Sequence, residues 1–204
     1  MQYIPTYFPS IRYMAALMND SSVNINLHCH YQKQTYRNRC KIYGANGPLN
    51  LTIPIRHTKS NEHQKDGNVK IMWDQDWQKQ HWKSLTSAYR SSPFFEFYED
   101  ELQEVFYQQP ENLMEYNLNL ISCLLSWLEA DIDFIFADQY IKFTADENRL
   151  IQAKNMPVEK LPYYTQVFEN KYGFIANLSV IDLIFNLGPQ SRYYLENLVQ
   201  SQPN

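Results

Sequence analysis

The chain has 204 residues, carries 18 lysines and arginines against 22 aspartates and glutamates, and is 15% aromatic. This length suits one domain with a substantial core, so we expect a single domain over residues 1–204. The acidic balance argues against nucleic-acid binding, which needs a broad basic surface. The three cysteines are odd in number and lack metal-ligand spacing, which argues against a disulfide framework.

No stretch of the sequence is long and apolar enough to span a bilayer. The most apolar run, Leu118–Leu128, has about half the required length and is interrupted by polar residues. The first ten residues contain two prolines and no apolar core, unlike a secretion signal. We therefore expect a soluble, cytoplasmic protein without a membrane span.

The first thirty residues predict a loop, a helix and a strand in that order. Tyr3–Phe8 is interrupted by a proline and has the character of a strand exit or a loop. Apolar residues at helical spacing follow Pro9 and Ser10 and predict a helix that ends before Asn19–Ser22. Val23–His30 alternates between apolar and polar residues, as a half-buried strand does. This order indicates an α/β opening.

The segment Tyr31–Ile55 concentrates positive charge in a chain that is acidic overall. Four basic side chains fall within nine positions, and at least three of them share a side whether the segment is extended or helical: Lys33, Arg37, Arg39 and Lys41. Basic side chains this close repel one another unless they are solvated or face an anion. A solvated basic surface is one explanation, and a bound phosphate or diphosphate is the other.

The residues between these charges favour a ligand site over a solvated surface, because they supply further hydrogen-bonding groups. We expect Lys33, Arg37 and Arg39 to bind the phosphate of a small-molecule substrate. Tyr36 and Asn38 are expected to orient that substrate.

A turn and a strand follow the basic residues. Gly44–Pro48 predicts the turn, and Leu49–Ile55 alternates as a strand that ends or runs at an edge near Pro54. Arg56–Asn68 contains no apolar residue, so we expect a loop that closes over the substrate.

The rest of the chain is mainly helical, with short strands at Val69–Trp73 and Asp133–Phe136 and an irregular stretch at Lys142–Pro162. We therefore expect an α/β fold, with a small mixed sheet, flanking helices and a helical C-terminal half. The predicted helices are Asp76–Tyr89 (starting at Asp74 in the alternative), Phe94–Tyr107, Glu111–Ala130, Val180–Leu187 and Gln190–Gln200.

Two titratable residues are candidates for catalysis. His81 follows Trp77 by one helical turn, and it is either a general base or a hydrogen-bonded core histidine. Asp182 lies within an apolar helix, three residues after Ser179. It is either the acid of a capping box or the partner of one of the arginines.

The sequence predicts no metal and no cofactor. His28 and His30 share a strand face near Cys40, but their spacing matches no zinc site. The common glycine-rich nucleotide fingerprints and the G-x-S-x-G motif are absent. The sequence does not indicate an oligomeric state.

The segment YQKQTYRNRCKIYGANGPLNLTIPI resembles the signature of the WbqC-like family, a basic core followed by a glycine turn and an L-T-[IV]-P-[IV] strand. The resemblance extends over nearly the whole chain. It departs at the start, where Ile4–Tyr7 replaces a His-Gln-Pro-Asn-like stretch found in many members. The further matches are Tyr7–Pro9, Tyr13, Trp77, His81, Trp82, Tyr89, Ser92–Phe95, Phe174, Leu178–Leu183 and Asn186–Gly188.

This family is associated with gene clusters for bacterial cell-surface polysaccharides such as O-antigen. The resemblance implies a setting, the building or decorating of a sugar, and no particular mechanism. With the basic segment added, we expect a transferase of that biosynthesis that acts on a phosphate-bearing donor such as a nucleotide sugar or an acyl carrier. The alternative is a non-catalytic binding protein for an anionic saccharide or a pathway partner. A third, weaker analogy is a nucleotidyltransferase-like α/β fold, because Pro5–Met18 looks like a strand exit that leads into a helix.

Overall fold

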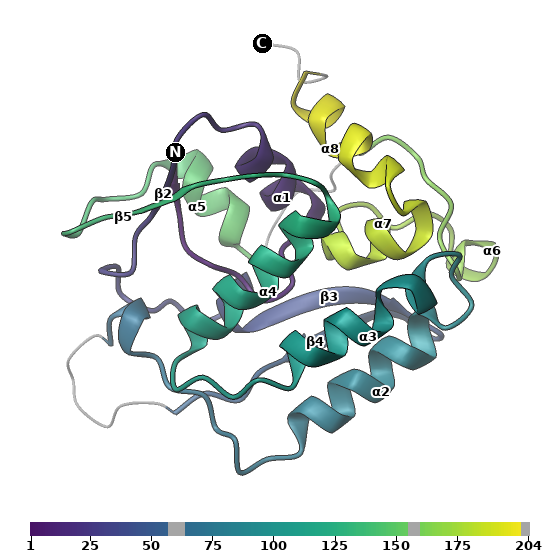
Figure 1. The fold of residues 1–204 in the computed structure, drawn as a ribbon, viewed down its shortest axis with the longest axis horizontal. Coiled ribbons are helices and arrows are strands. Elements are labelled where there is room, and N and C mark those ends of the chain that lie inside the picture. Colours follow the sequence, from purple (N-terminus) through teal and green to yellow (C-terminus); the bar gives the residue numbers. More distant parts are fainter. Residues whose placement is uncertain (57–63, 155–159, 201–204) are drawn as a thin grey trace.

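Helices surround two small β-structures, a parallel sheet and an antiparallel hairpin (Figure 1). The structure is a computed structural model, and it describes residues 1–56, 64–154 and 160–200. Within these residues the expected α/β class is confirmed. The Arg56–Asn68 loop falls partly outside them, since residues 57–63 are not described.

The parallel sheet has three strands in the order β1-β2-β5. These are β1 (Gln2–Tyr3), β2 (Val23–Ile25) and β5 (Phe134–Phe136). The helix α1 (Ile11–Met18) connects β1 to β2, as parallel pairing requires. The Ser10 side chain caps α1 by accepting from the Tyr13 amide.

The hairpin consists of β3 (Arg39–Gly44) and β4 (Gly47–Thr52), which confirms the predicted turn. Its register runs from Arg39 opposite Thr52 to Gly44 opposite Gly47. The backbone of Gly47 has φ 99°, a conformation that glycine adopts without a Cβ penalty.

The helices expected after the hairpin are present, with slightly different ends. Gly188 ends the helix before the last one at φ 55°. The helices are α2 (Trp77–Tyr89), α3 (Phe95–Phe106), α4 (Leu113–Trp127), α7 (Val180–Leu187) and α8 (Gln190–Gln200), together with the short α5 (Ala145–Ile151) and α6 (Glu169–Tyr172).

Three local predictions were wrong. Val23–His30 pairs as a strand only over its first three residues. Val69–Trp73 makes isolated bridges instead of a regular strand. Lys142–Pro162 contains α5, which is capped reciprocally by Thr144 and Glu147.

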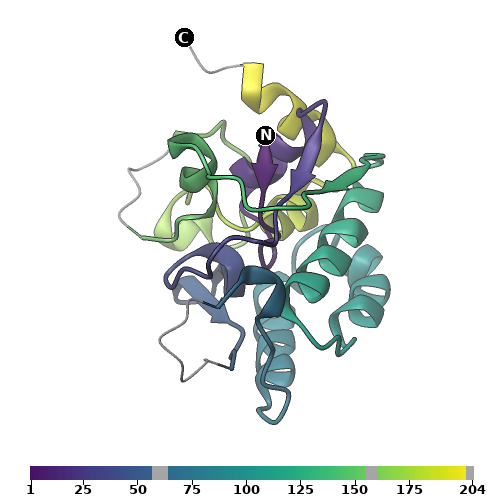
Figure 2. The same ribbon diagram turned by 90° about the vertical axis from the view of Figure 1, so that its left-hand side faces the viewer.

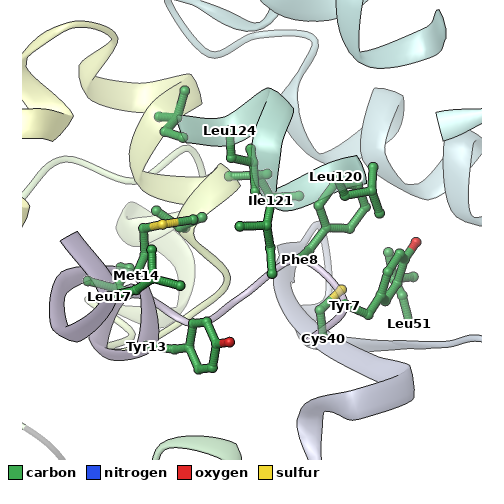
Figure 3. Close-up of a cluster of buried hydrophobic side chains, with 14 of the residues drawn as sticks. Tyr7, Phe8, Tyr13, Met14, Leu17, Cys40, Leu51, Leu120, Ile121 and Leu124 are labelled. Atoms are coloured by element: carbon green, nitrogen blue, oxygen red, sulfur yellow. The ribbon is translucent and has the colours of Figure 1, made fainter. Parts of the chain in front are cut away.

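The core forms where α4 meets the turn after β1 and the hairpin. Figure 3 shows Leu120, Ile121 and Leu124 of α4 beside the ring of Phe8, with Tyr7 on the hairpin side. All five side chains are buried, and each contributes about 1.5–3 kcal/mol through burial. The turn after β1 is therefore held between α4 and the hairpin, which positions the start of α1.

Candidate functional site

The four basic residues do not form one cluster. The predicted extended or regular helical conformation is replaced by a 3-10 turn, Tyr36–Asn38, that leads into β3. This turn directs Arg37 into the interior, where its side chain is buried. Its guanidinium donates to both carboxylate oxygens of Asp66, at 2.8 Å from Nε and 3.1 Å from the terminal nitrogen.

The ion pair gives Arg37 a structural role in this arrangement, and its role as a phosphate ligand stays a prediction. A bidentate ion pair occupies the face of the guanidinium that would bind phosphate. The partner, Asp66, is fully buried in a second 3-10 turn, Asp66–Asn68, at the end of the predicted lid. The polar segment Arg56–Asn68 thus contributes a buried carboxylate, that of Asp66, to the interior.

Asn38 is also buried and serves the hairpin. Its amide nitrogen donates to the carbonyl of Ile53 at 2.8 Å, which ties the start of β3 to the chain after β4. Its oxygen is buried and has no partner among the residues described. The predicted role of Asn38 in orienting a substrate stays a prediction, and its side chain is buried in this arrangement.

Arg39 and Lys41 remain on the outer side of β3, because Cys40 between them and Ile42 after them are buried in the core. Both basic side chains are half-buried, and neither forms an ion pair with any residue that the structure describes. The Nε atom of Arg39 is buried without a hydrogen-bond partner in the same part of the chain. A buried donor without a hydrogen bond destabilises the fold, so this atom favours a ligand that would accept from it.

Tyr31 lies near the same charges. Burial raises the pKa of the Tyr31 hydroxyl to about 12, and the charges of Arg37 and Arg39 offset part of this effect. Lys33 is exposed, two residues further along, and has no ion pair with a described residue. The outward basic set is therefore Lys33, Arg39 and Lys41.

A shallow depression lies beside Lys41 and includes Tyr36. Its volume is about 140 Å³, it does not enclose a water-sized space, and its lining is Phe8, Ser10, Tyr36, Lys41, Asn177 and Ser179. Two of these residues, Phe8 and Asn177, have left-handed backbones at φ 40° and 53°. This conformation is unusual for a ring as bulky as that of Phe8, and strained residues cluster at binding sites.

The starts of α1 and α7 meet at this depression. Ser10 and Ser179 form an antiparallel bridge, and the Ser179 hydroxyl donates to the Phe8 carbonyl at 2.9 Å. The first amides of α1 are already bonded: the Ile11 amide donates to Leu178 and the Arg12 amide to the Asn177 side chain. The Val180 amide of α7 likewise donates to the Pro9 carbonyl, so the two helices can act on this surface only through the positive ends of their dipoles.

His81 lies in the core between α2 and the hairpin. Its Nδ1 atom is 2.9 Å from the Tyr7 hydroxyl, and a backbone hydrogen bond joins the ring to Thr52. Burial lowers the pKa of His81 to about 4, so the ring is neutral at pH 7. This geometry favours the alternative of a hydrogen-bonded core histidine, and a role as base stays a prediction.

Asp182 fits neither of the two roles considered for it. It is fully buried and accepts from the Tyr89 hydroxyl at 2.9 Å, the Tyr164 hydroxyl at 2.7 Å and the Gln166 amide at 3.1 Å. Burial raises its pKa to about 6, and these three hydrogen bonds oppose the increase. It pairs with no described arginine, and Ser179 makes no side-chain cap to α7.

The Asp182 network reaches the edge of the hairpin. The Tyr89 hydroxyl accepts from the Tyr43 amide of β3 at 3.3 Å, and the Ser179 amide donates to the carbonyl of Lys41 at 2.8 Å. Asp182 and Lys41 are therefore linked through the same two elements, β3 and α7.

The structure offers no evident metal ligands within the part that it describes. No group of three or more histidine, cysteine or acidic residues there could hold a metal ion. The three cysteines are buried and unpaired with one another. No helix of the described residues is long and apolar enough to cross a bilayer.

Sequence reasoning missed the residues that shape the depression. Neither Phe8 nor Asn177 was expected to line a site, because a left-handed backbone at a non-glycine residue leaves no mark in the sequence. Asp66 was hidden in the polar loop. Nothing in the sequence distinguishes this aspartate from the solvated polar residues around it, and only the fold shows that it binds the buried guanidinium of Arg37.

The comparison with protein families completes the identification. The model of the WbqC-like protein family matches residues 4–156, three quarters of the chain, and the chain belongs to this family. The match includes the turn after β1, the hairpin and its outward basic residues, whereas α7 lies beyond it.

One relative shares about a quarter of its residues with this chain. The chain is 25% identical over 194 residues to the uncharacterized protein Rv1507c of Mycobacterium tuberculosis, covering 81% of this chain and 83% of that protein. No solved structure matches the chain.

Proposed function

We propose that this protein binds a phosphate-bearing intermediate of cell-surface polysaccharide biosynthesis on the outer side of β3. The observation that carries the proposal is the guanidinium of Arg39, whose buried Nε atom has no partner in the described structure. An arginine that lacks a carboxylate partner is prepared to bind a phosphate through parallel, charge-assisted hydrogen bonds.

Lys41 supplies the second positive charge. Alternate residues of a strand lie roughly 6–7 Å apart on one face, which is a span that a phosphate or diphosphate can bridge. The starts of α1 and α7 add only their positive dipole ends next to Lys41, since their first amides already donate to protein acceptors. Lys33, which is exposed nearby in the sequence, is placed to attract the anion before it binds.

Family membership supports the biological setting that we propose. The WbqC-like family is associated with polysaccharide gene clusters, and activated sugars of such pathways carry phosphates next to the group that is transferred. Nucleotide sugars and acyl carriers both present this chemistry. The proposed ligand is accordingly a donor of this class, with its phosphates against Arg39 and Lys41.

A thermal-shift and calorimetry panel of nucleotide sugars and acyl-coenzyme A thioesters tests the proposal. At least one ligand should stabilise the wild type, and Arg39→Ala should weaken its binding about 10- to 100-fold through loss of a charged hydrogen bond. The matched control is Arg149→Ala, which removes the same charge from an exposed pair with Asp146. No stabilising ligand, or equal weakening by both variants, would contradict the proposal.

A second candidate function is transfer of a group from the bound donor. The observation that favours it is Asp182, whose pKa of about 6 lies in the range of a proton-transfer residue and whose helix begins at the depression. Against it, both Asp182 and His81 are buried and hydrogen-bonded. Mass-spectrometric detection of a transferred product that Asp182→Asn abolishes would support a transferase, whereas saturable binding without product supports the binding protein.

A further inference from the structure

Strand β5 leaves one edge and parts of both faces exposed. It pairs with β2 on one side, and no other strand of the described chain pairs with its second edge. Figure 2 shows β5 at the margin of the sheet, beyond β1 and β2. Ile135 is 52% exposed and Phe136 is 54% exposed. Successive strand residues point to opposite faces, so neither face is fully covered.

This exposure is unusual for a parallel strand. Parallel strands in α/β proteins are normally covered by helices on both faces. The chain that follows β5 extends the apolar surface, since Tyr140 and Ile141 are also exposed. Large apolar side chains next to an open strand edge mark a surface that binds another strand.

The backbone of β5 specifies how that strand would pair. The Ala137 amide donates to Ile25 of β2, so the residues at odd positions direct their N–H groups toward β2. Phe134 and Phe136 consequently direct their N–H and C=O groups toward the open edge. Four backbone hydrogen-bonding groups are thus available in the spacing of an antiparallel ladder.

A second copy of β5 matches this edge. In an antiparallel pair centred on Ile135, Phe134 lies opposite Phe136 of the second copy, and symmetry repeats the pair. The paired residues exchange both backbone hydrogen bonds, and cross-strand aromatic pairs add stability. We propose that two copies of the chain associate through their β5 strands, joining two three-stranded sheets into one six-stranded sheet.

The charges around β5 agree with this register. In the antiparallel pair centred on Ile135, Asp133 faces Ala137 of the second copy and Asp138 faces Ile132, so no two carboxylates are directly opposite. An in-register parallel pair would instead place each of these aspartates beside its own copy, which is destabilising. The two-fold antiparallel arrangement is therefore the one that the charge pattern permits.

Light scattering after size-exclusion chromatography measures the association. The wild-type chain should be a dimer, and Ile135→Lys should raise the dissociation constant roughly 30-fold or more by placing a charge at the centre of the pair. The matched control is Phe97→Lys, which changes a residue of α3 that is 79% exposed and should leave the dimer intact. A wild type that stays monomeric at its highest soluble concentration overturns the proposal, as does equal loss in both variants.

Cysteine cross-linking tests the register with an uncharged replacement at Ile135, a half-exposed position where folding should be preserved. Ile135 lies on the two-fold axis as a pair without mutual hydrogen bonds, with a Cα separation of about 4.5 Å. This distance lies within the range of a disulfide, so Ile135→Cys should form a covalent dimer on mild oxidation. Tyr193→Cys, at a position that is 72% exposed on α8, should not. Equal cross-linking at both positions, or none at Ile135→Cys, contradicts the pairing.

Discussion

The buried ion pair between Arg37 and Asp66 allows a direct test of whether Arg37 is structural while Arg39 is free to bind a ligand. Arg37→Met keeps most of the side-chain volume and leaves a buried carboxylate without its cation. Two hydrogen bonds to Asp66 are lost, together with a weaker one to Thr35 at 3.3 Å. Breaking a buried pair from one side costs about 3–5 kcal/mol, against a total stability of about 5–15 kcal/mol for a typical domain.

Urea unfolding followed by tryptophan fluorescence measures this loss as a change in the free energy of unfolding. Arg39→Met is the matched control, two residues away, and should cost less than about 1 kcal/mol because its guanidinium has no ion pair in the described structure. The double variant Arg37→Met/Asp66→Leu removes both charges and should be clearly more stable than the sum of the two single changes predicts. Equal costs for the two arginines, or a coupling energy near zero, would refute the assignment of Arg37 as a structural residue.

Three further predictions concern a close approach and two buried titratable groups. Gly188→Ala should cost clearly more than Gly173→Ala, because both have positive φ but only the added Cβ at Gly188 meets the Phe94 ring, at 2.5 Å. The pKa of Asp182 is above its ordinary value, so the wild type should lose up to about 3 kcal/mol relative to Asp182→Asn as pH rises from about 4 to 6. The pKa of His81 is below its ordinary value, so the wild type should lose up to about 3 kcal/mol relative to His81→Gln as pH falls from about 6.5 to 4.

The two pH effects oppose each other between pH 4 and 6, and each is therefore measured as the difference between the wild type and its variant in denaturant unfolding at several pH values. Parallel stability curves for Asp182→Asn and wild type would show that the buried carboxyl has an ordinary pKa. Equal losses at the two glycines would show that the Phe94 ring moves aside at no cost.

The sequence predicts the elements whose pattern is periodic. The turn at Gly44–Pro48 and the helices α2, α3, α4 and α7 follow from glycine chemistry and apolar spacing. The helix α5 was missed although its capping residues, Thr144 and Glu147, are visible in the sequence. Its apolar periodicity is too weak over seven residues to compete with the polar composition around it.

The candidate site was predicted less completely, because the direction of a side chain depends on the local turn. Alternation places Arg37 and Arg39 on one face, and the 3-10 turn before β3 separates them. Asp66 lies in a uniformly polar segment, so its sequence surroundings do not predict burial. It is buried because it binds Arg37, 29 residues away in the chain. Phe8 and Asn177, whose backbones are left-handed, each lie two residues before a member of the Ser10–Ser179 bridge, and no local pattern predicts that contact between distant segments.

The central claim, that Arg39 and Lys41 bind a phosphate-bearing group, is tested most directly by a ³¹P NMR titration with pyrophosphate, the charged moiety that nucleotide-sugar donors share. Wild type should shift the phosphorus resonance saturably, Arg149→Ala should do the same, and Arg39→Ala and Lys41→Ala should each weaken the effect. An unchanged resonance with the wild type, or the same titration curve for Arg39→Ala, would contradict it.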